Sequence, residues 1–250
     1  MTHINPFLAS VADHSEALKP ARPLVMRMVP LPLAPVNASP VPGLTSLYHR
    51  ADAGPWGDRG YPGNCSGYLI RDLLKFYGAK TVYEPMSGSG TCLEVCRDLG
   101  LYSQSADIHE GVDACEARFD EEFDFVWLHP PYWRQKLYAD DPKDLSREPT
   151  LDGFLKRYRQ LIDACAQALK PGGHMAILMG DYQDREAGFV PLVYHTKRLA
   201  FELGLKQCAT DIIRFSHGAS SSRKVYRSSF IPGLHDTCVI FVKPHTKEGV

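Results

Sequence analysis

The sequence predicts an α/β fold in which helices cover both faces of a doubly wound, mostly parallel sheet. Between residues 68 and 243, segments with apolar residues at helical spacing alternate with short apolar runs typical of buried strands. Several helical segments end at glycine or at a Pro-Gly run, both of which stop a helix. Such alternation is typical of parallel sheets, whose ligands bind beyond the carboxyl ends of the strands.

The individual elements follow one another in a regular order. The first helix is predicted over 68–78 and ends at Gly78. A longer helix over 151–170 has one apolar face and is stopped by the Pro-Gly-Gly run at 171–173. The other helices are expected over 92–100 and 190–204, and the strands over 80–85, 104–108, 123–128, 174–181, 208–215 and 236–243.

The overall composition excludes several classes of protein. The 250 residues are 44% hydrophobic and 23% charged with a net charge of −1, so no overall field attracts nucleic acid or membrane. Seven cysteines, mostly in apolar segments, predict free thiols in a reducing compartment and no metal site. Without a signal peptide or an apolar run of membrane-spanning length, we expect a cytoplasmic protein with no membrane partner.

Three segments fall outside the regular pattern. Residues 1–45 are rich in proline and are expected to form an arm, which a single domain over 46–250 follows. Within that domain, residues 134–150 and 214–231 are polar and poorly periodic. We interpret both as loop insertions that contact the substrate.

A glycine-rich turn joins a predicted strand to the next helix. Its sequence, EPMSGSGT, runs from Glu84 to Thr91, and Gly88 and Gly90 allow the backbone to turn tightly beside a ligand. A phosphate-binding loop needs Lys-Ser/Thr after its last glycine. A dinucleotide-binding turn needs a third glycine, where this chain has Leu93. Neither ATP nor a dinucleotide is therefore favoured.

Two carboxylates indicate which ligand the turn receives. Glu84, at the end of its strand, would repel a pyrophosphate and suits a positive charge or amine donors instead. Asp107 ends the next strand, where a carboxylate can accept both hydroxyls of a ribose. A nucleoside with a cationic amino-acid tail satisfies both groups, and S-adenosylmethionine is such a molecule.

A predicted buried strand ends in the sequence HPPYW. Pro130 and Pro131 donate no backbone hydrogen bond and have a fixed φ, so a rigid, extended loop follows the strand. This loop carries the imidazole of His129 and the rings of Tyr132 and Trp133 at the edge where ligands bind. Trp133 either assists at such a site or packs against the sheet.

Together the two motifs resemble those of the amino-directed DNA methyltransferases. Residues 84–91 resemble the cofactor motif Asp-Pro-Phe-x-Gly-Ser-Gly-Thr, and residues 129–132 the catalytic motif Asp/Asn/Ser-Pro-Pro-Tyr/Phe/Trp. The resemblance extends from Tyr61 to Lys243. It implies a class I methyltransferase fold, Rossmann-like, with a seven-stranded sheet, an antiparallel last strand and S-adenosylmethionine as cofactor.

The resemblance also implies roles for individual residues around the cofactor. Glu84 would sit near its amino group, Gly88 would make room for its methionine moiety, and Asp107 would hold its ribose. Asp113 or its neighbours would contact adenine, and Met86 replaces the usual Phe. The full set of implied cofactor-binding residues is Tyr61, Glu84, Met86, Gly88, Gly90, Thr91, Asp107 and Asp113.

His129 stands where the family has Asp, Asn or Ser. In the family this residue accepts a hydrogen bond from the exocyclic amine of the target base, whose lone pair is delocalised into the ring. A neutral imidazole can accept that bond, together with the Pro130 carbonyl, and near neutral pH it can also take up the proton. Tyr132 would stack on the flipped base, and Pro131 stiffens the loop. The alternative is a His129 turned into solvent, with backbone carbonyls positioning the amine.

Nucleic acid is expected to contact both loop insertions. Arg134 and Lys136 follow the catalytic motif closely enough to meet phosphates, and Arg223, Lys224 and Arg227 lie among serines in the second insertion. The alternative for the second insertion is a solvated surface loop. The chain has no room for a separate recognition domain, so a short or relaxed target sequence is expected.

The favoured interpretation is a DNA methyltransferase, with adenine N6 slightly preferred to cytosine N4. HPPYW fits both bases, whereas cytosine C5 is disfavoured because no Pro-Cys dipeptide supplies the nucleophile. Two alternatives stay open: an enzyme acting on RNA or on a protein glutamine, and a catalytically silent relative that binds nucleic acid. The sequence leaves open the recognition sequence, the oligomeric state and the existence of a restriction partner.

Overall fold

The structure, a computed structural model, describes residues 36, 38–50, 52–118, 121–215, 231 and 233–245. The arm predicted over 1–45 falls mostly outside these residues, so the division at residue 46 stays a prediction. Of the second predicted insertion, only residues 214, 215 and 231 are described. No described helix is both long and apolar enough to cross a membrane.

A large sheet forms the centre of the described domain and confirms the predicted fold class. Seven strands lie on a continuous path, β1-β9-β10-β5-β4-β2-β3, and β8 adds an eighth by pairing with β10. The pairs are parallel except those of β10, which is antiparallel to β5, β8 and β9. The strands are β1 (Leu47–Tyr48), β2 (Thr81–Glu84), β3 (Tyr102–Ser105), β4 (Phe123–Leu128), β5 (Leu169–Met179), β8 (Lys206–Gln207), β9 (Ile212–Phe215) and β10 (His235–Val242).

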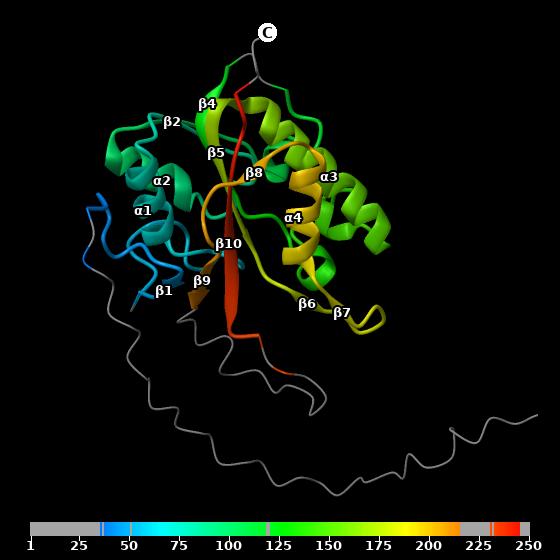
Figure 1. Ribbon diagram of the computed structural model, residues 1–250. Helices are drawn as coiled ribbons and strands as arrows, with labels where there is room; N and C mark the ends of the chain where they lie inside the picture. The colour runs from blue at the N-terminus through cyan, green and yellow to red at the C-terminus, as the bar shows by residue number, and fades with distance from the viewer. Residues whose placement is uncertain are drawn as a thin grey trace, which may run out of the picture. The chain divides into compact units, whose positions relative to one another are not determined.

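Helices cover both faces of this sheet. Figure 1 shows α1 and α2 on one side of it and α3 and α4 on the other. A small hairpin of β6 (Tyr182–Gln183) and β7 (Phe189–Val190) follows β5. The helices are α1 (Gly67–Tyr77), α2 (Thr91–Leu99), α3 (Leu151–Ala168) and α4 (Leu192–Glu202), with short 3-10 turns at Ile108–Glu110, Trp133–Gln135 and Leu145–Arg147.

Alternation along the central strands divides the apolar core into two layers. On β5, Met175, Ile177 and Met179 pack in the layer with α3 and α4, whereas Ala176 and Leu178 pack in the layer with α1 and α2. All five side chains are fully buried. Burial on both faces explains why the strand has a continuous apolar sequence rather than an alternating one.

One predicted strand is shifted because a polar residue ends it. β3 runs from Tyr102 to Ser105 rather than over 104–108. Asp107 leaves the strand and caps the short 3-10 turn that follows, since its carboxylate accepts a hydrogen bond from the N–H of His109. The strand therefore ends before Asp107, whose carboxylate lies in the turn that follows.

The Pro-Gly-Gly run at 171–173 does not mark the end of α3. The helix ends at Ala168, and β5 begins at Leu169, which pairs with Phe123 on β4. The run lies inside β5, where the N–H of Gly172 donates to the carbonyl of Lys243. The predicted strand over 208–215 is shortened to β9, and the separate short strand β8 precedes the predicted range.

Strand direction decides which residues meet at one edge of the sheet. The parallel strands β3, β2, β4 and β5 end at that edge, where Asp107, Glu84, His129 and Gly180 follow one another across the sheet. Because β10 is antiparallel, it begins at the same edge, and Asp236 lies near its start. Five strands thus deliver polar residues or turns to one place.

Replacing Leu178 with Ala should destabilise the domain by about 2–5 kcal/mol, because it leaves a cavity between the central sheet and α1–α2. Leu137→Ala serves as a control, since Leu137 is 49% exposed and its loss should change the free energy of unfolding by less than about 0.5 kcal/mol. Urea unfolding followed by circular dichroism measures both. Equal losses in the two variants would contradict the assigned core.

Candidate active site at the carboxyl edge of the sheet

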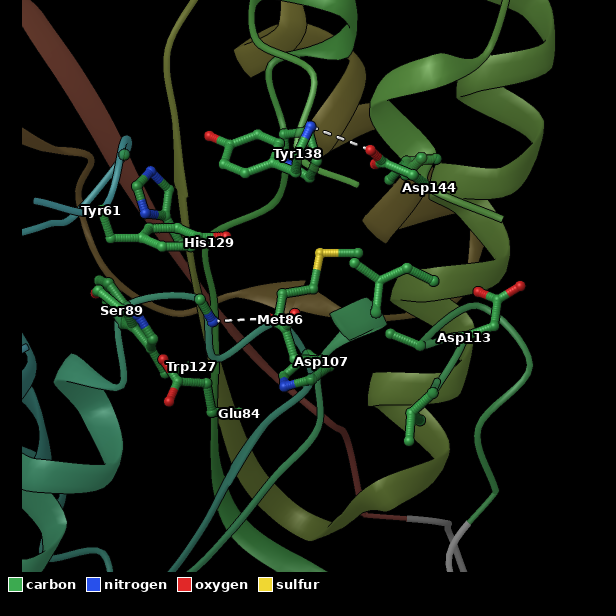
Figure 2. Close-up of a pocket in the computed structure, with 18 of the residues that line it drawn as sticks. Tyr61, Glu84, Met86, Ser89, Asp107, Asp113, Trp127, His129, Tyr138 and Asp144 are labelled. Atoms are coloured by element: carbon green, nitrogen blue, oxygen red, sulfur yellow. Dashed lines mark hydrogen bonds between the residues drawn. The ribbon is translucent and has the colours of Figure 1, made fainter. Parts of the chain in front are cut away.

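A pocket of about 770 Å³, part of it open to solvent, lies between the glycine-rich turn and the loop after β4. Figure 2 shows the side chains around it. The lining includes the predicted residues Tyr61, Glu84, Met86, Gly88, Thr91, Asp107, Asp113, His129 and Pro131, whereas Gly90, Pro130 and Tyr132 lie outside it.

The glycine-rich turn is shaped by two contacts of Gly88. Its φ of 45° lies in the left-handed region that favours glycine, and its N–H donates to Oδ2 of Asp107 over 2.8 Å. A Cβ at this position would lie 2.8 Å from Cε1 of Tyr61. Gly88 is therefore required both for the turn and for the close approach of the Tyr61 ring.

Glu84 is a buried carboxyl group with an unpartnered oxygen. Its Oε2 atom is inaccessible to solvent and has no hydrogen-bond partner, and burial raises the pKa of Glu84 well above its usual value. Backbone N–H groups of Cys92 and Leu93, at the start of α2, oppose this shift by favouring the carboxylate. Glu84 lines the pocket, and its unpartnered oxygen suits a donor carried by a ligand.

Asp107 joins the glycine-rich turn to the segment after β3. Oδ1 accepts from the N–H of His109 at 3.0 Å, and Oδ2 accepts from the N–H of Gly88 at 2.8 Å. A carboxylate has about four acceptor positions, so each oxygen keeps one for a ligand hydroxyl. The two backbone bonds hold the side chain in one orientation within the pocket.

Asp113 is differently engaged. Oδ1 accepts from the N–H of Cys115 at 2.9 Å, and Oδ2 accepts from Nη2 of Arg157 at 2.9 Å. Both oxygens thus stabilise the pocket wall, and the contact of Asp113 or its neighbours with adenine stays a prediction. Ile108 and Val112 line the pocket beside Met86, and together they form an apolar surface.

His129 lies at the end of β4 and lines the pocket rather than turning into bulk solvent. Burial lowers the pKa of His129 to about 4, so the imidazole is neutral near pH 7. Such a group accepts a hydrogen bond but is a weak base, which disfavours the predicted uptake of a proton near neutral pH. Its Nε2 lies 3.1 Å from Oη of Tyr132.

Tyr132 is held away from the pocket lining. Its ring lies over Gly180, since a Cβ added there would be 2.6 Å from Cε2 of Tyr132. The ring is partly buried against the core layer of α3 and α4. The predicted stacking of a target base on this ring would therefore compete with contacts that the ring already makes.

The insertion over 134–150 supplies part of the pocket lining, through residues that were not predicted from the sequence, Tyr138, Lys143, Asp144 and Leu145. Trp133 anchors it, because Nε1 donates to the carbonyl of Glu148 at 2.8 Å. Asp144 accepts hydrogen bonds from the N–H groups of Tyr138 and Ala139 at 3.1 and 2.8 Å, which shapes the loop. The Tyr138 ring then stacks on Tyr61 with centroids 6.1 Å apart. No local sequence pattern marks Tyr138 or Asp144.

The two cations predicted to meet phosphates in this loop differ in availability. Arg134 donates twice to Asp184, at 2.9 and 2.7 Å, and once to Glu186 at 2.8 Å. These carboxylates neutralise its charge, so the structure does not present Arg134 as a phosphate ligand. Lys136 is exposed. Arg223, Lys224 and Arg227 lie outside the described residues, and no described group of His, Cys, Asp and Glu could hold a metal ion.

Comparison with known proteins gives similarity at the level of structure alone. No protein-family model matches the chain, and no curated protein matches it significantly. A SAM-dependent methyltransferase from Archaeoglobus fulgidus is 17% identical with a TM-score of 0.44, over 72% of this chain and 95% of that one. A "putative sarcosine dimethylglycine methyltransferase" from Galdieria sulphuraria is 16% identical with a TM-score of 0.48, over 71% and 85%.

The chain is also similar to a "Putative DNA Modification Methylase" from Thermus thermophilus complexed with S-adenosyl-L-methionine. The identity is 16% and the TM-score 0.38, over 68% of this chain and 58% of that one. This chain thus spans little more than half the length of that protein. At such low identities, and with TM-scores below 0.5, the reaction and substrate must be inferred from the pocket itself.

Replacing Glu84 with Gln should change how stability depends on pH. The folded carboxyl has a raised pKa, so its contribution is full below the unfolded value of about 4.3 and is lost as pH rises through the folded value. Gln does not ionise, so the melting temperature of Glu84→Gln relative to wild type should increase with pH. Scanning calorimetry measures it, with the exposed Glu116→Gln as control. A difference that stays constant with pH would contradict the buried, protonated state.

Proposed function

We propose that this protein is a DNA methyltransferase that uses S-adenosylmethionine to methylate the exocyclic amine of a flipped base. Adenine N6 is preferred to cytosine N4, within a short or relaxed target sequence. The observation that carries the proposal is the convergence of three groups on one pocket. These are the unpartnered oxygen of Glu84, the oriented carboxylate of Asp107 and the neutral imidazole of His129.

The pocket residues fit this cofactor. Oε2 of Glu84 would accept a hydrogen bond from its ammonium group, and a positive charge there would restore the carboxylate against the cost of burial. The remaining acceptor positions of Asp107 suit the ribose hydroxyls. Met86 and Ile108 offer an apolar surface to the adenine ring. When bound, the cofactor supplies an electrophilic methyl group on a sulfonium.

His129 would act on the amine that receives the methyl group. A neutral imidazole nitrogen and the carbonyl of Pro130 would each accept a hydrogen bond from one N–H group of the amine. These two bonds localise the lone pair of the amine nitrogen for attack on the methyl group. With a pKa of about 4, the imidazole holds a proton poorly near pH 7. The proton lost after transfer therefore passes to water, and His129 serves as an acceptor.

DNA binding would depend on cations beyond the pocket. Arg134 is paired with Asp184, so the proposal assigns phosphate contacts to Lys136 and to the basic cluster of Arg223, Lys224 and Arg227. Backbone contacts of this kind carry no sequence information, which supports relaxed specificity. RNA and protein glutamine offer amines of similar chemistry and are separate outcomes of the test below.

Replacing Gly88 with Ala should weaken S-adenosylmethionine binding about ten-fold or more, the cost of roughly 1.4 kcal/mol of overpacking against Tyr61. Gly90→Ala is the matched control, because Gly90 also has a positive φ, of 75°, but a Cβ there meets no atom within 4 Å. Isothermal titration calorimetry compares the two variants. Equal weakening would mean that backbone strain, rather than the Tyr61 contact, governs the site.

Incubation with S-adenosylmethionine and unmethylated DNA, followed by digestion and mass spectrometry, should yield N6-methyladenine. His129→Ala should lower the rate roughly 100-fold, because it removes the acceptor for the amine. His129→Asn should keep more of the activity, since its amide oxygen accepts a hydrogen bond.

Parallel reactions with RNA and with a glutamine-containing peptide distinguish the alternative substrates. Measured cofactor binding without methylated DNA would reject the DNA proposal. Transfer to neither alternative would then favour a silent relative.

A further inference from the structure

Three residues from separate strands meet beside Gly180, just outside the pocket. Tyr132 follows β4, Asp236 lies on β10, and Arg214 lies directly opposite Asp236 on β9. A Cβ added at Gly180 would lie 2.6 Å from Cε2 of Tyr132 and 2.8 Å from Oδ1 of Asp236. The absence of a side chain at residue 180 therefore lets the Tyr132 ring and the Asp236 carboxylate come together.

Asp236 has two different neighbours. Nη2 of Arg214 donates a hydrogen bond to its Oδ2, and both side chains are largely buried, at 12% and 20% exposure. The carboxylate also interacts with the hydroxyl of Tyr132 and raises the pKa of that residue, although burial is the larger cause. Tyr132 is thus a protonated phenol between a carboxylate and the imidazole of His129.

The one proton of the Tyr132 hydroxyl can point either towards Asp236 or towards His129. A carboxylate can only accept, and a phenol has one proton to donate. The negative charge of Asp236, which raises the pKa of Tyr132, favours the orientation of the hydroxyl that points its proton towards Asp236. The oxygen lone pair of Tyr132 then faces Nε2 of His129, 3.1 Å away. Nε2 must then carry the proton of the neutral imidazole. The other ring nitrogen, Nδ1, is left with a free lone pair.

We infer that Asp236 and Tyr132 are positioning residues that hold His129 in the tautomer protonated at Nε2, so that Nδ1 is the acceptor offered to the target amine. This inference deepens the proposed function and rests on it only for the identity of the amine. The tautomer itself is a property of the protein alone. Gly180 is the site of closest approach that makes the arrangement possible.

The reverse arrangement would disable the site. If the Tyr132 hydroxyl donated to Nε2, the proton would lie on Nδ1, and His129 would present a donor to an amine that also donates. Two donors facing each other repel, and the lone pair of the amine would stay delocalised. The carboxylate of Asp236 opposes this arrangement because it would face an oxygen lone pair.

Nuclear magnetic resonance tests the tautomer without any substrate. Long-range 1H–15N correlation at neutral pH reports which ring nitrogen carries the proton, and His129→Gln identifies the signals of His129. We expect the proton on Nε2 in the wild-type protein. In Asp236→Asn, whose amide can donate to the Tyr132 oxygen, a measurable fraction should move to Nδ1. A wild-type proton on Nδ1, or an unchanged tautomer in Asp236→Asn, would overturn the inference.

Asp236→Asn also removes the carboxylate partner of Arg214, which can destabilise the fold. A second variant, tested by enzyme kinetics, leaves this ion pair intact. Tyr132→Phe keeps the aromatic ring and any stacking but loses the hydroxyl. It should lower kcat about ten-fold, the contribution of one buried hydrogen bond, with KM for S-adenosylmethionine unchanged. Tyr182→Phe is the control, since Tyr182 donates to Asp184 at 3.0 Å and does not line the pocket.

The two kinds of failure are distinguishable. An unchanged kcat in Tyr132→Phe would overturn the positioning role. The expected tautomers without methylation of any nucleic acid or peptide would support the inference and reject the proposed function.

Discussion

Desolvation at the carboxyl edge of the sheet is the constraint on which the chemistry of the pocket depends. It raises the pKa of Glu84 and lowers that of His129, so burial favours the neutral form of both groups although one is an acid and the other a base. A cationic ligand would change this balance in opposite ways. It would favour the charged form of Glu84 and disfavour the charged form of His129. Binding of one cationic ligand would thus favour ionised Glu84 as its counter-ion and keep the acceptor His129 neutral.

Much of the fold could be predicted because buried elements show their period in the sequence. α1, α2 and β4 follow the predicted ranges within one residue, and the antiparallel direction of β10 was expected from the family resemblance. The errors lie where hydrogen bonding overrides local signals. The Pro-Gly-Gly run is typical of a helix stop, but Lys243, directly after the neighbouring strand β10, exchanges backbone hydrogen bonds with Gly172 and Gly173 and keeps the run within β5.

The candidate site was predictable only where its residues lie in contiguous motifs. Glu84, Gly88, Asp107 and His129 follow strand ends, and local sequence marks each of them. Tyr138, Asp144 and Asp236 could not be found in this way, because each acts on a residue far along the chain. For the same reason the sequence could not predict that Asp113 accepts a hydrogen bond from Arg157. Nor could it predict that Arg134 pairs with Asp184, because each partner lies on another element.

The absence of a side chain at Gly180 also limits how this candidate site can change. An Asp at position 129 would set a second carboxylate beside the Tyr132 hydroxyl, which has one proton to share with Asp236. A larger residue at 180 would separate Tyr132 from Asp236, and the proton of the His129 imidazole would then no longer be held on Nε2. The histidine, the tyrosine, the glycine and the aspartate are therefore exchangeable as a set rather than singly. A chain carrying this histidine is expected to carry its three companions, although they lie on three different segments.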